Sequence, residues 1–439
     1  MFERLFGKGR KRPEQTVPDI QFGRYSDNNK STEKVNRWTE ADHLFKEKRY
    51  PESFDAFFDY LSDDSIKNVA YERNGKEGRF ELFQGSKIVR GRYDENLFSA
   101  EVTLARMPQP STPVMRRLLE MNFSLYYTRF ALDDERLCMR FDSPTEVSNP
   151  NKLYYGLKEL ATKADKQDDL LVKDFTILEK HDTEHVKEIP EQEKETKYQF
   201  LQHWITETLD YVNTLDADKF HGGIAYLLLA LAFRIDYLLV PEGSLMHDIE
   251  KLVEAYFRKD DRPVPEKNQE LIGAFVMIRE RSKEEVFACL YRSTHTFSIV
   301  APQHYKTIAD VIGNANQGTA WFRDNKYPLI AEKISEYGIS YCQFSYSLPK
   351  PVTAFFELFM RVNYSDYFEA LGFERKYYDK TASKFLTEDI YKRINEINEE
   401  WSRKYPQLNF RTESLDFENM MHFNQSFSSE IEFLNFENK

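Results

Sequence analysis

Cysteine and glycine are scarce in this chain, and both shortages exclude something. Three cysteines among 439 residues cannot form a disulfide framework, so we expect a reducing compartment and a cytoplasmic protein. Cys138, Cys289 and Cys342 are isolated within apolar stretches, which is typical of buried thiols rather than of zinc ligands. Only 16 glycines are present, which favours packed helices and broad strands over sites built from loops.

Long uninterrupted apolar runs are also absent. The most apolar window, residues 222–240, approaches the length of a membrane span, but Arg234 and Asp236 lie inside it. A charged side chain in the middle of a bilayer is costly. The window therefore predicts a buried central helix, with a membrane span as the alternative.

The N-terminus lacks the apolar stretch of a signal peptide. Phe2, Leu5 and Phe6 would share one helical face, and five basic residues lie in the same segment, residues 1–12. Such a segment can touch an anionic membrane surface weakly. A solvated terminus is the preferred interpretation.

The motifs of common chemistry are missing as well. The sequence contains no glycine-rich phosphate loop, no G-x-S-x-G turn and no H-E-x-x-H pair. His181 and His185 have a spacing suited to metal ligands, but they lie in a charged stretch where such pairs arise by chance. His295 follows Ser293 with nothing in sequence to orient its ring. We therefore expect no catalytic residue, no metal and no cofactor; an enzyme whose site is assembled from distant residues is the alternative.

Acidic and aromatic residues are abundant instead. Lysine and arginine number 61 and aspartate and glutamate 73, so the formal charge is −12, which argues against general nucleic-acid binding. Hydrophobic residues at 41% and charged residues at 31% suit a folded soluble protein. The 35 phenylalanines and 26 tyrosines must fill packed layers or form docking surfaces.

The first half of the chain predicts an α+β domain over residues 36–175, after a flexible lead-in at 1–35. The expected order is helix, three strands, helix, two strands, helix. The elements are a helical pair within 38–61, strands at 79–83, 87–93 and 96–106, a helix at 112–121, strands at 124–132 and 136–141, and a helix at 151–171.

The second half predicts a mostly α-helical domain. Residues 176–198 are rich in charge and read as a linker. Apolar residues then recur at helical spacing over 199–405, which indicates an irregular bundle or a short solenoid. The acidic, Phe-rich tail at 406–439 is expected to pack its rings onto the body; an exposed peptide captured by a partner is the alternative.

Two loose resemblances accompany this order. Ala41–Leu61 resembles a single tetratricopeptide-type helical hairpin, which must pack on another element because one repeat cannot bury its own face. Residues 65–175 are similar to the type III secretion chaperone fold and to the bacterial YbjN-like family that shares it, through LLEMN at 118–122, the hairpin at 126–141 and the helix containing 160–165. The resemblance implies a non-enzymatic module that receives a peptide or a partner protein, often as a dimer, with no catalytic residues to carry over.

Two groups of side chains are candidate partner-binding residues. The first is a basic set on the first predicted hairpin, and the second is an aromatic set around two prolines. Their members are Arg79, Lys87, Arg90 and Arg92, and Tyr341, Phe344, Tyr346 and Phe355. A solvated strand face and an ordinary core are the respective alternatives.

These observations together predict a non-catalytic protein-binding or chaperone-like protein of the bacterial cytoplasm. Its partner would be another protein or a peptide, and a homodimer is compatible with the pattern. The alternatives are a peripheral membrane scaffold anchored by residues 1–12 and an enzyme with a dispersed active site.

Overall fold

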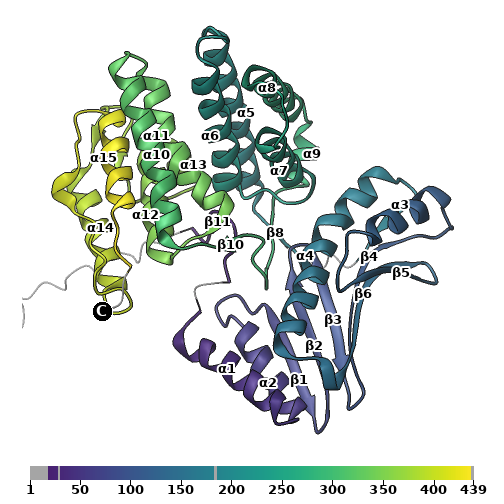
Figure 1. The fold of residues 1–439 in the computed structure, drawn as a ribbon. Helices are drawn as coiled ribbons and strands as arrows, with labels where there is room; N and C mark the ends of the chain where they lie inside the picture. The colour runs from purple at the N-terminus through teal and green to yellow at the C-terminus, as the bar shows by residue number, and fades with distance from the viewer. Residues whose placement is uncertain (1–17, 28–29, 182–184, 437–439) are drawn as a thin grey trace, which may run out of the picture.

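The computed structural model describes residues 18–27, 30–181 and 185–436. Its buried apolar residues fall into two clusters. One cluster joins residues between 41 and 178 with Phe297, and the other spans residues 189–434. Figure 1 shows the corresponding arrangement, a sheet with flanking helices beside a larger helical body.

The N-terminal body is built on one antiparallel sheet. Its strands follow the order β1-β2-β3-β4-β6-β5, and β7 pairs with β4 at one end. The elements are α1 (Thr32–Lys46), α2 (Tyr50–Leu61), β1 (Val69–Asn74), β2 (Glu77–Gln84), β3 (Lys87–Tyr93), β4 (Leu97–Arg106), α3 (Thr112–Asn122), β5 (Arg129–Asp133), β6 (Arg136–Pro144), the 3-10 turn η1 (Thr145–Val147), α4 (Pro150–Asp174) and β7 (Glu179–Lys180).

Aromatic rings fill the space between this sheet and helices α2 and α4. Phe58 of α2 lies 4.6 Å from Phe80 of β2, and Phe80 lies 5.2 Å from Phe98 of β4, measured between ring centroids. Gly91 of β3 permits this packing, since a Cβ atom there would lie 2.0 Å from the Phe80 ring. The face that carries these rings is the inner face, and alternation along each strand sends the intervening side chains to the opposite, outer face.

Helices dominate the C-terminal body. Short strand pairs, β8 with β9, β10 with β11 and β12 with β13, tie its loops together. The elements are β8 (Lys187–Glu188), α5 (Glu191–Asn213), α6 (His221–Leu239), α7 (Gly243–Phe257), α8 (Val264–Arg279), α9 (Lys283–Phe287), β9 (Tyr291–Arg292), β10 (Ala301–Pro302), α10 (Tyr305–Asp324), α11 (Pro328–Ser345), β11 (Tyr346–Ser347), α12 (Lys350–Asn363), α13 (Ser365–Ala370), β12 (Tyr378–Asp379), β13 (Lys384–Phe385), α14 (Thr387–Trp401), the 3-10 turn η2 (Thr412–Ser414) and α15 (Met420–Glu432).

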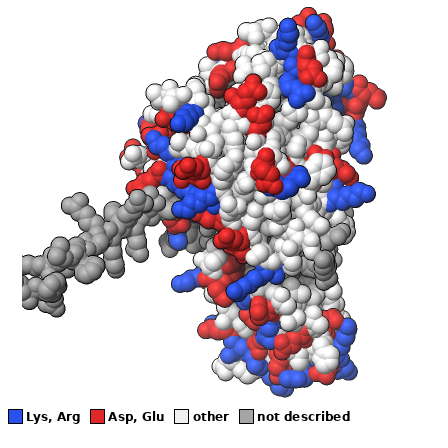
Figure 2. Space-filling model, turned by 90° about the vertical axis from the view of Figure 1, so that its left-hand side faces the viewer, with Lys and Arg blue, Asp and Glu red and all other residues white. Residues whose placement is uncertain are grey.

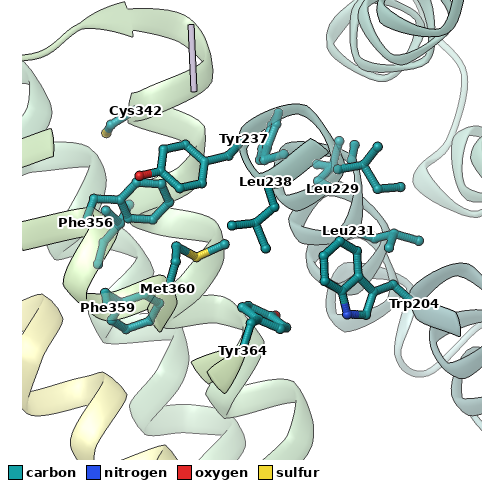
Figure 3. Packing of buried hydrophobic residues seen from close by; sticks show 14 of the residues in the cluster. Trp204, Leu229, Leu231, Tyr237, Leu238, Cys342, Phe356, Phe359, Met360 and Tyr364 are labelled. Carbon is teal, nitrogen blue, oxygen red and sulfur yellow. The ribbon is translucent and has the colours of Figure 1, made fainter. Parts of the chain in front are cut away.

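Helix α6 is the central helix that its sequence predicts. Among the described residues it is the one helix long and apolar enough to cross a membrane, and 89% of its most apolar stretch is buried inside the protein. Figure 3 shows its Leu229 and Leu238 within the aromatic and aliphatic packing of this body. Its two charged residues are satisfied by ion pairs, Arg234 with Glu336 of α11 and Asp236 with Arg24. Because each charge is paired, the cost of burying it in a core helix is offset.

Two segments connect the bodies. The first is the stretch of chain before α1. Its Phe22 packs on Phe368 with ring centroids 5.1 Å apart. The guanidinium of its Arg24 bonds Asp236 and also reaches Glu250 of α7 at 3.0 Å. In the second, Gly85 forms an isolated antiparallel bridge with Thr294. The Gln84 side chain accepts hydrogen bonds from the backbone N–H groups of Thr296 and Phe297, which places Phe297 in the core of the sheet body.

The mixed α and β character is confirmed, but the expected strand pattern is wrong in two places. The sheet begins with β1, a fourth strand before α3, which pairs with β2 from Val69↔Leu82 onward. It is an edge strand, and its sequence, VAYERN, places three apolar residues before three polar ones, so the alternation is weak. The second hairpin also starts later than expected: residues 124–128 form a loop, and β5 begins at Arg129.

Two further expectations concern charge and aromatic content. Part of the predicted linker is helical, since α5 starts at Glu191. Glu193 and Lys197 are buried there as an i,i+4 pair with their charged atoms 3.1 Å apart, which neutralises the charge that suggested a linker. In the Phe-rich tail, Phe410, Phe423 and Phe427 are buried as expected, while Phe433 is 71% exposed.

Candidate functional site: the arginine face of the sheet

Charged side chains of opposite sign alternate across the outer face of the sheet. In an antiparallel sheet, directly opposed residues point to the same face. The register therefore joins Glu81, Arg90, Glu101, Arg140 and Arg129 into one row across five strands. Arg90 has an acidic neighbour on either side, which is favourable, whereas Arg140 has Glu101 on one side and Arg129 on the other.

The adjacent row also contains an arginine pair. Arg79 of β2 lies directly opposite Arg92 of β3, with Glu72 of β1 on the other side of Arg79 and Ser99 of β4 on the other side of Arg92. Like charges in opposed positions destabilise a sheet pair. Arg79 and Arg92 are both exposed, and neither makes an ion pair with any residue that the structure describes. The face therefore holds two guanidinium groups available for an external anion.

Four arginines surround a hollow at this place. The hollow has a volume of about 340 Å³ and is lined by the side chains of Arg79, Arg90, Arg92 and Arg140, together with Ser99 and Glu101. Glu101 is shared by two cations, Arg136 at 2.9 Å and Arg140 at 3.3 Å. Arg90 is bonded to Glu81 at 3.1 Å. We call Arg79, Arg90, Arg92 and Arg140 the arginine face.

The arginine face can bind anions but has no group suited to covalent chemistry. Guanidinium groups donate paired hydrogen bonds to carboxylates and phosphates, and they stay charged at all ordinary pH values. The neighbouring thiol on the outer face is Cys138, whose pKa is raised to about 11 by burial and by Glu101. A thiol with that pKa is protonated at neutral pH and is a poor nucleophile.

Charge on the face of the molecule that Figure 2 views is mixed. Figure 2, which views the helical side, shows blue and red side chains interspersed, without a field of one sign. Near its lower end, over the region of α1 and α2, both signs are dense. The arginine pair on the outer face of the sheet is set against a net charge of −12 for the chain.

Lys87, the fourth predicted basic residue, does not belong to this face. It is 1% exposed. Its ammonium group pairs with Asp168 of α4 at 3.0 Å and donates to the backbone oxygens of Leu104 and His181. The prediction that Lys87 contributes to an interaction surface is wrong, because its charge is consumed by an internal ion pair.

The predicted aromatic set is mostly interior packing. Phe355 is fully buried against Phe410, with ring centroids 4.8 Å apart, so it cannot reach a partner. Tyr341 and Phe344 are half-buried against Phe233. Tyr346 is half-buried as well, and lines a second hollow of about 340 Å³ between residues 22–26, α11 and α12. The structure does not unite these rings into one exposed groove.

The other chemical candidates are dispersed. His295 is stacked on Tyr25, and burial lowers its pKa to about 4, so the ring is neutral at physiological pH. Ser293 bonds Glu242 rather than a histidine. His185 lies beside the Gly85 carbonyl oxygen at 3.3 Å, and the residues between it and His181 are outside the described part of the chain.

One group with metal-ligand chemistry escaped sequence reasoning. Asp416, Glu418 and His422 bring their ligand atoms within 4.8 Å of one another at the start of α15. Both acids are exposed, and His422 is already bonded to Glu418 and Asn419. Exposed acids gathered around a helix start are common without an ion, so this cluster is not assigned as a site.

Sequence reasoning also missed part of the arginine face. Arg140 and Glu101 come from β6 and β4, which lie far from the first hairpin in sequence. The signal was present in the alternation of LFSAEVTLAR and RLCMRFD, which sends Glu101 and Arg140 to the polar side of their strands. The pairing of β4 with β6 across α3 is what places them beside Arg90.

Comparison with known proteins adds no assignment: no protein-family model matches this chain, and no curated protein matches its sequence.

Proposed function

We propose that this protein is a non-catalytic, chaperone-like binding protein whose arginine face receives an acidic segment of another protein. The observation that carries the proposal is the directly opposed, exposed pair Arg79 and Arg92, which makes no ion pair with the described residues although Glu72 stands across from Arg79. A pair of this kind is unfavourable in isolation. It becomes favourable when a carboxylate lies between the two guanidinium groups.

The shape of the site supports a protein segment as the ligand. The hollow is shallow and open, unlike the deep, mostly apolar pocket of a small-molecule site. The alternating row beside it, Arg90, Glu101 and Arg140, offers donors and acceptors in register along the sheet. An extended acidic segment with interspersed polar groups matches that pattern, and the net negative charge of the chain disfavours bulk nucleic acid.

The test is a binding titration with a fluorescein-labelled oligoglutamate peptide. We predict that the double variant Arg79→Glu/Arg92→Glu binds this peptide at least about tenfold more weakly than the wild type, which corresponds to about 1.4 kcal/mol of binding free energy. The physical reason is that both free guanidinium groups are replaced by repelling carboxylates. Fluorescence anisotropy at low ionic strength measures the affinity, and added salt should weaken wild-type binding.

The matched control is Arg258→Glu/Lys259→Glu, which makes the same change in charge on exposed positions at the end of α7. This control should retain near-wild-type affinity at equal ionic strength. Equal loss in both double variants would show that the peptide responds only to net charge, and the proposal would be wrong. Unchanged binding in the Arg79→Glu/Arg92→Glu variant would also reject the arginine face.

The membrane scaffold suggested by the basic N-terminus lies outside the described residues, since residues 1–17 are not among them. Among the described residues, the histidine and serine candidates for a dispersed active site are separated or neutral, and the acidic side chains that do gather, Asp165, Asp168 and Glu242, lie at the contact between the two bodies. The non-catalytic proposal therefore agrees best with the observed chemistry. The resemblance to secretion chaperones and YbjN-like proteins supports the same class of role.

A further inference from the structure

The largest exposure of aromatic side chains in the N-terminal body occurs at one corner. Phe123 is 95% exposed and Tyr126 is 91% exposed, both just after the end of α3. Three more large side chains are exposed on α3, on the same loop and on α4. We call the five residues Leu119, Phe123, Tyr126, Tyr127 and Tyr155 the aromatic corner. Figure 1 places this corner, around α3 and the start of β5, at the end of the molecule remote from α14 and α15.

The aromatic corner is held rigidly rather than left loose. The carboxylate of Glu159 on α4 accepts hydrogen bonds from the backbone N–H groups of Tyr126, Tyr127 and Thr128, at 2.9, 2.8 and 3.0 Å. It also accepts the Thr128 hydroxyl at 3.0 Å. Tyr155 precedes Glu159 by one helical turn, so it lies on the same side of α4. The loop is thus fixed in a conformation that presents its rings to the outside.

The high exposure of Phe123 and Tyr126 indicates the local shape of the surface. A ring that lies in a groove or on a flat face loses much of its surface to its neighbours, so values of 95% and 91% describe rings that project from the protein. A projecting knob cannot enclose a peptide. Projecting rings bury their apolar surface only when they insert into a lipid membrane or into a pocket of another protein.

Cations border the aromatic corner. Arg116 and Arg117 are exposed on α3 within two turns of Phe123, and Lys163 is exposed on α4 one turn after Glu159. Glu159 is engaged by the loop, and Glu120 and Arg116 are paired with each other at 3.1 Å, so Arg117 and Lys163 are the two of these cations that make no ion pair with the described residues. Because exposed charges are screened beyond about 10 Å at ordinary salt, these local cations matter more at a contact than the total charge of the chain.

We propose that the aromatic corner is a docking site for an anionic lipid membrane surface, with Phe123 and Tyr126 inserted at headgroup depth. Phenylalanine and leucine bury their apolar surface there, and tyrosine is enriched at the interface between hydrocarbon and water. Arginine and lysine beside the inserted rings attract acidic headgroups. The site is separate from the arginine face, and it adds a location to the binding role without depending on it.

The test is co-sedimentation of the full chain with two kinds of vesicle. One kind is pure phosphatidylcholine, and the other contains one part phosphatidylserine to three parts phosphatidylcholine. Wild-type protein should sediment with the phosphatidylserine vesicles, and Phe123→Ser/Tyr126→Ser should lower the partition coefficient at least about tenfold. Arg116→Gln/Arg117→Gln should weaken binding to the acidic vesicles only. Circular dichroism and elution volume establish that each variant is folded.

A direct readout of insertion comes from Phe123→Trp. Its added fluorescence should be quenched by brominated lipids beyond the quenching of the four native tryptophans. The matched control is Phe433→Ser, which removes another exposed phenylalanine, at the end of α15, and should leave vesicle binding unchanged.

Three outcomes would overturn the proposal. The first is absence of wild-type binding to the acidic vesicles. The second is binding that is lost in Phe2→Ser/Leu5→Ser/Phe6→Ser but kept in Phe123→Ser/Tyr126→Ser, which would assign membrane contact to the N-terminus. The third is a wild-type dimer in solution that becomes monomeric in Phe123→Ser/Tyr126→Ser with no change in vesicle binding, which would make the corner a contact between copies. None of these results depends on oligoglutamate binding, so the two proposals fail separately.

Discussion

Replacing Glu336 by glutamine is expected to destabilise the helical body by about 3–5 kcal/mol, the cost of leaving a buried cation without its partner. Glu336 is fully buried and bonds Arg234 through Nε at 2.8 Å and Nη2 at 3.4 Å. Lys333 lies 3.2 Å away, and the Tyr364 hydroxyl donates to the same carboxylate at 2.5 Å. Although burial raises the pKa of Glu336, Arg234 and Lys333 hold it below its ordinary value, so the neutral side chain is a poor substitute.

Urea denaturation followed by tryptophan fluorescence measures this effect. Trp204 is a suitable reporter because the Arg234 guanidinium lies 5.7 Å from the centre of its ring. The control Glu332→Gln removes a partly exposed carboxylate on the same helix and should cost less than about 1 kcal/mol.

The double variant Arg234→Met/Glu336→Leu should recover most of the loss, because it removes the unpaired cation together with its partner. A loss below about 1 kcal/mol in Glu336→Gln would contradict the assignment of this pair as a fully desolvated one. Failure of the double variant to recover would instead place the cost in packing around α6 and α11.

A second large effect is expected from Glu242→Gln, which should stabilise the protein at pH 8 by up to about 3 kcal/mol and have little effect near pH 4.5. Glu242 precedes α7 at the contact between the two bodies and is buried. Burial raises its pKa from 4.5 to about 7; Asp169 and Asp236 add to this, while the Ser293 hydroxyl and Arg24 oppose it. Asp165 of α4, whose pKa is also raised by burial and by Glu242, accepts the Ser86 backbone N–H at 2.8 Å in the same cluster.

The direction follows from which state holds the proton. Between pH 4.5 and 7 the folded protein keeps the Glu242 proton, while the unfolded chain, with its lower pKa, has lost it. Stability therefore falls as pH rises through this window and levels off above it. One pKa unit corresponds to about 1.4 kcal/mol, which sets the size of the expected difference. Glutamine stays neutral throughout and removes this contribution.

Chemical denaturation of both proteins from pH 4.5 to 8.5 tests this expectation. The control Glu254→Gln lies on the exposed side of α7 and removes the same charge away from the buried cluster. Parallel curves for wild type and Glu242→Gln, offset by a constant amount, would contradict a titrating group at the contact between the bodies. A stability that rises with pH in the wild type would contradict it too.

The sequence predicted that the candidate site is basic, but it did not predict which residues form it. Arg90 and Arg92 stand two apart in an alternating strand, and that spacing alone places them on one polar face. Lys87 stands three residues before Arg90, so the same alternation sends it to the inner face of the sheet. There its ammonium group pairs with Asp168 of α4. Arg140 joined the site only through the pairing of β4 with β6.

The aromatic corner shows the opposite case. Ser124–Leu132 carries enough β-branched and aromatic character to predict one strand, yet the first five of these residues form a loop. The carboxylate of Glu159, 31 or more residues away in sequence, accepts the backbone N–H groups that a strand would have used in pairing. The hydrogen bonds to Glu159 thus outweighed the local preference for a strand, and the tyrosine rings of this loop are exposed.

Apolar spacing and one long apolar run by themselves determined that this chain has a strand-bearing N-terminal part, a helical C-terminal part and a buried helix within residues 222–240, which the structure shows at His221–Leu239. Only the tertiary structure decided which charges face water. The pairing of Arg234 with Glu336, of Lys87 with Asp168 and of Arg24 with Asp236 joins residues 80 or more apart. The energy of a charge depends on what stands within a few ångströms of it, and sequence spacing does not contain that information.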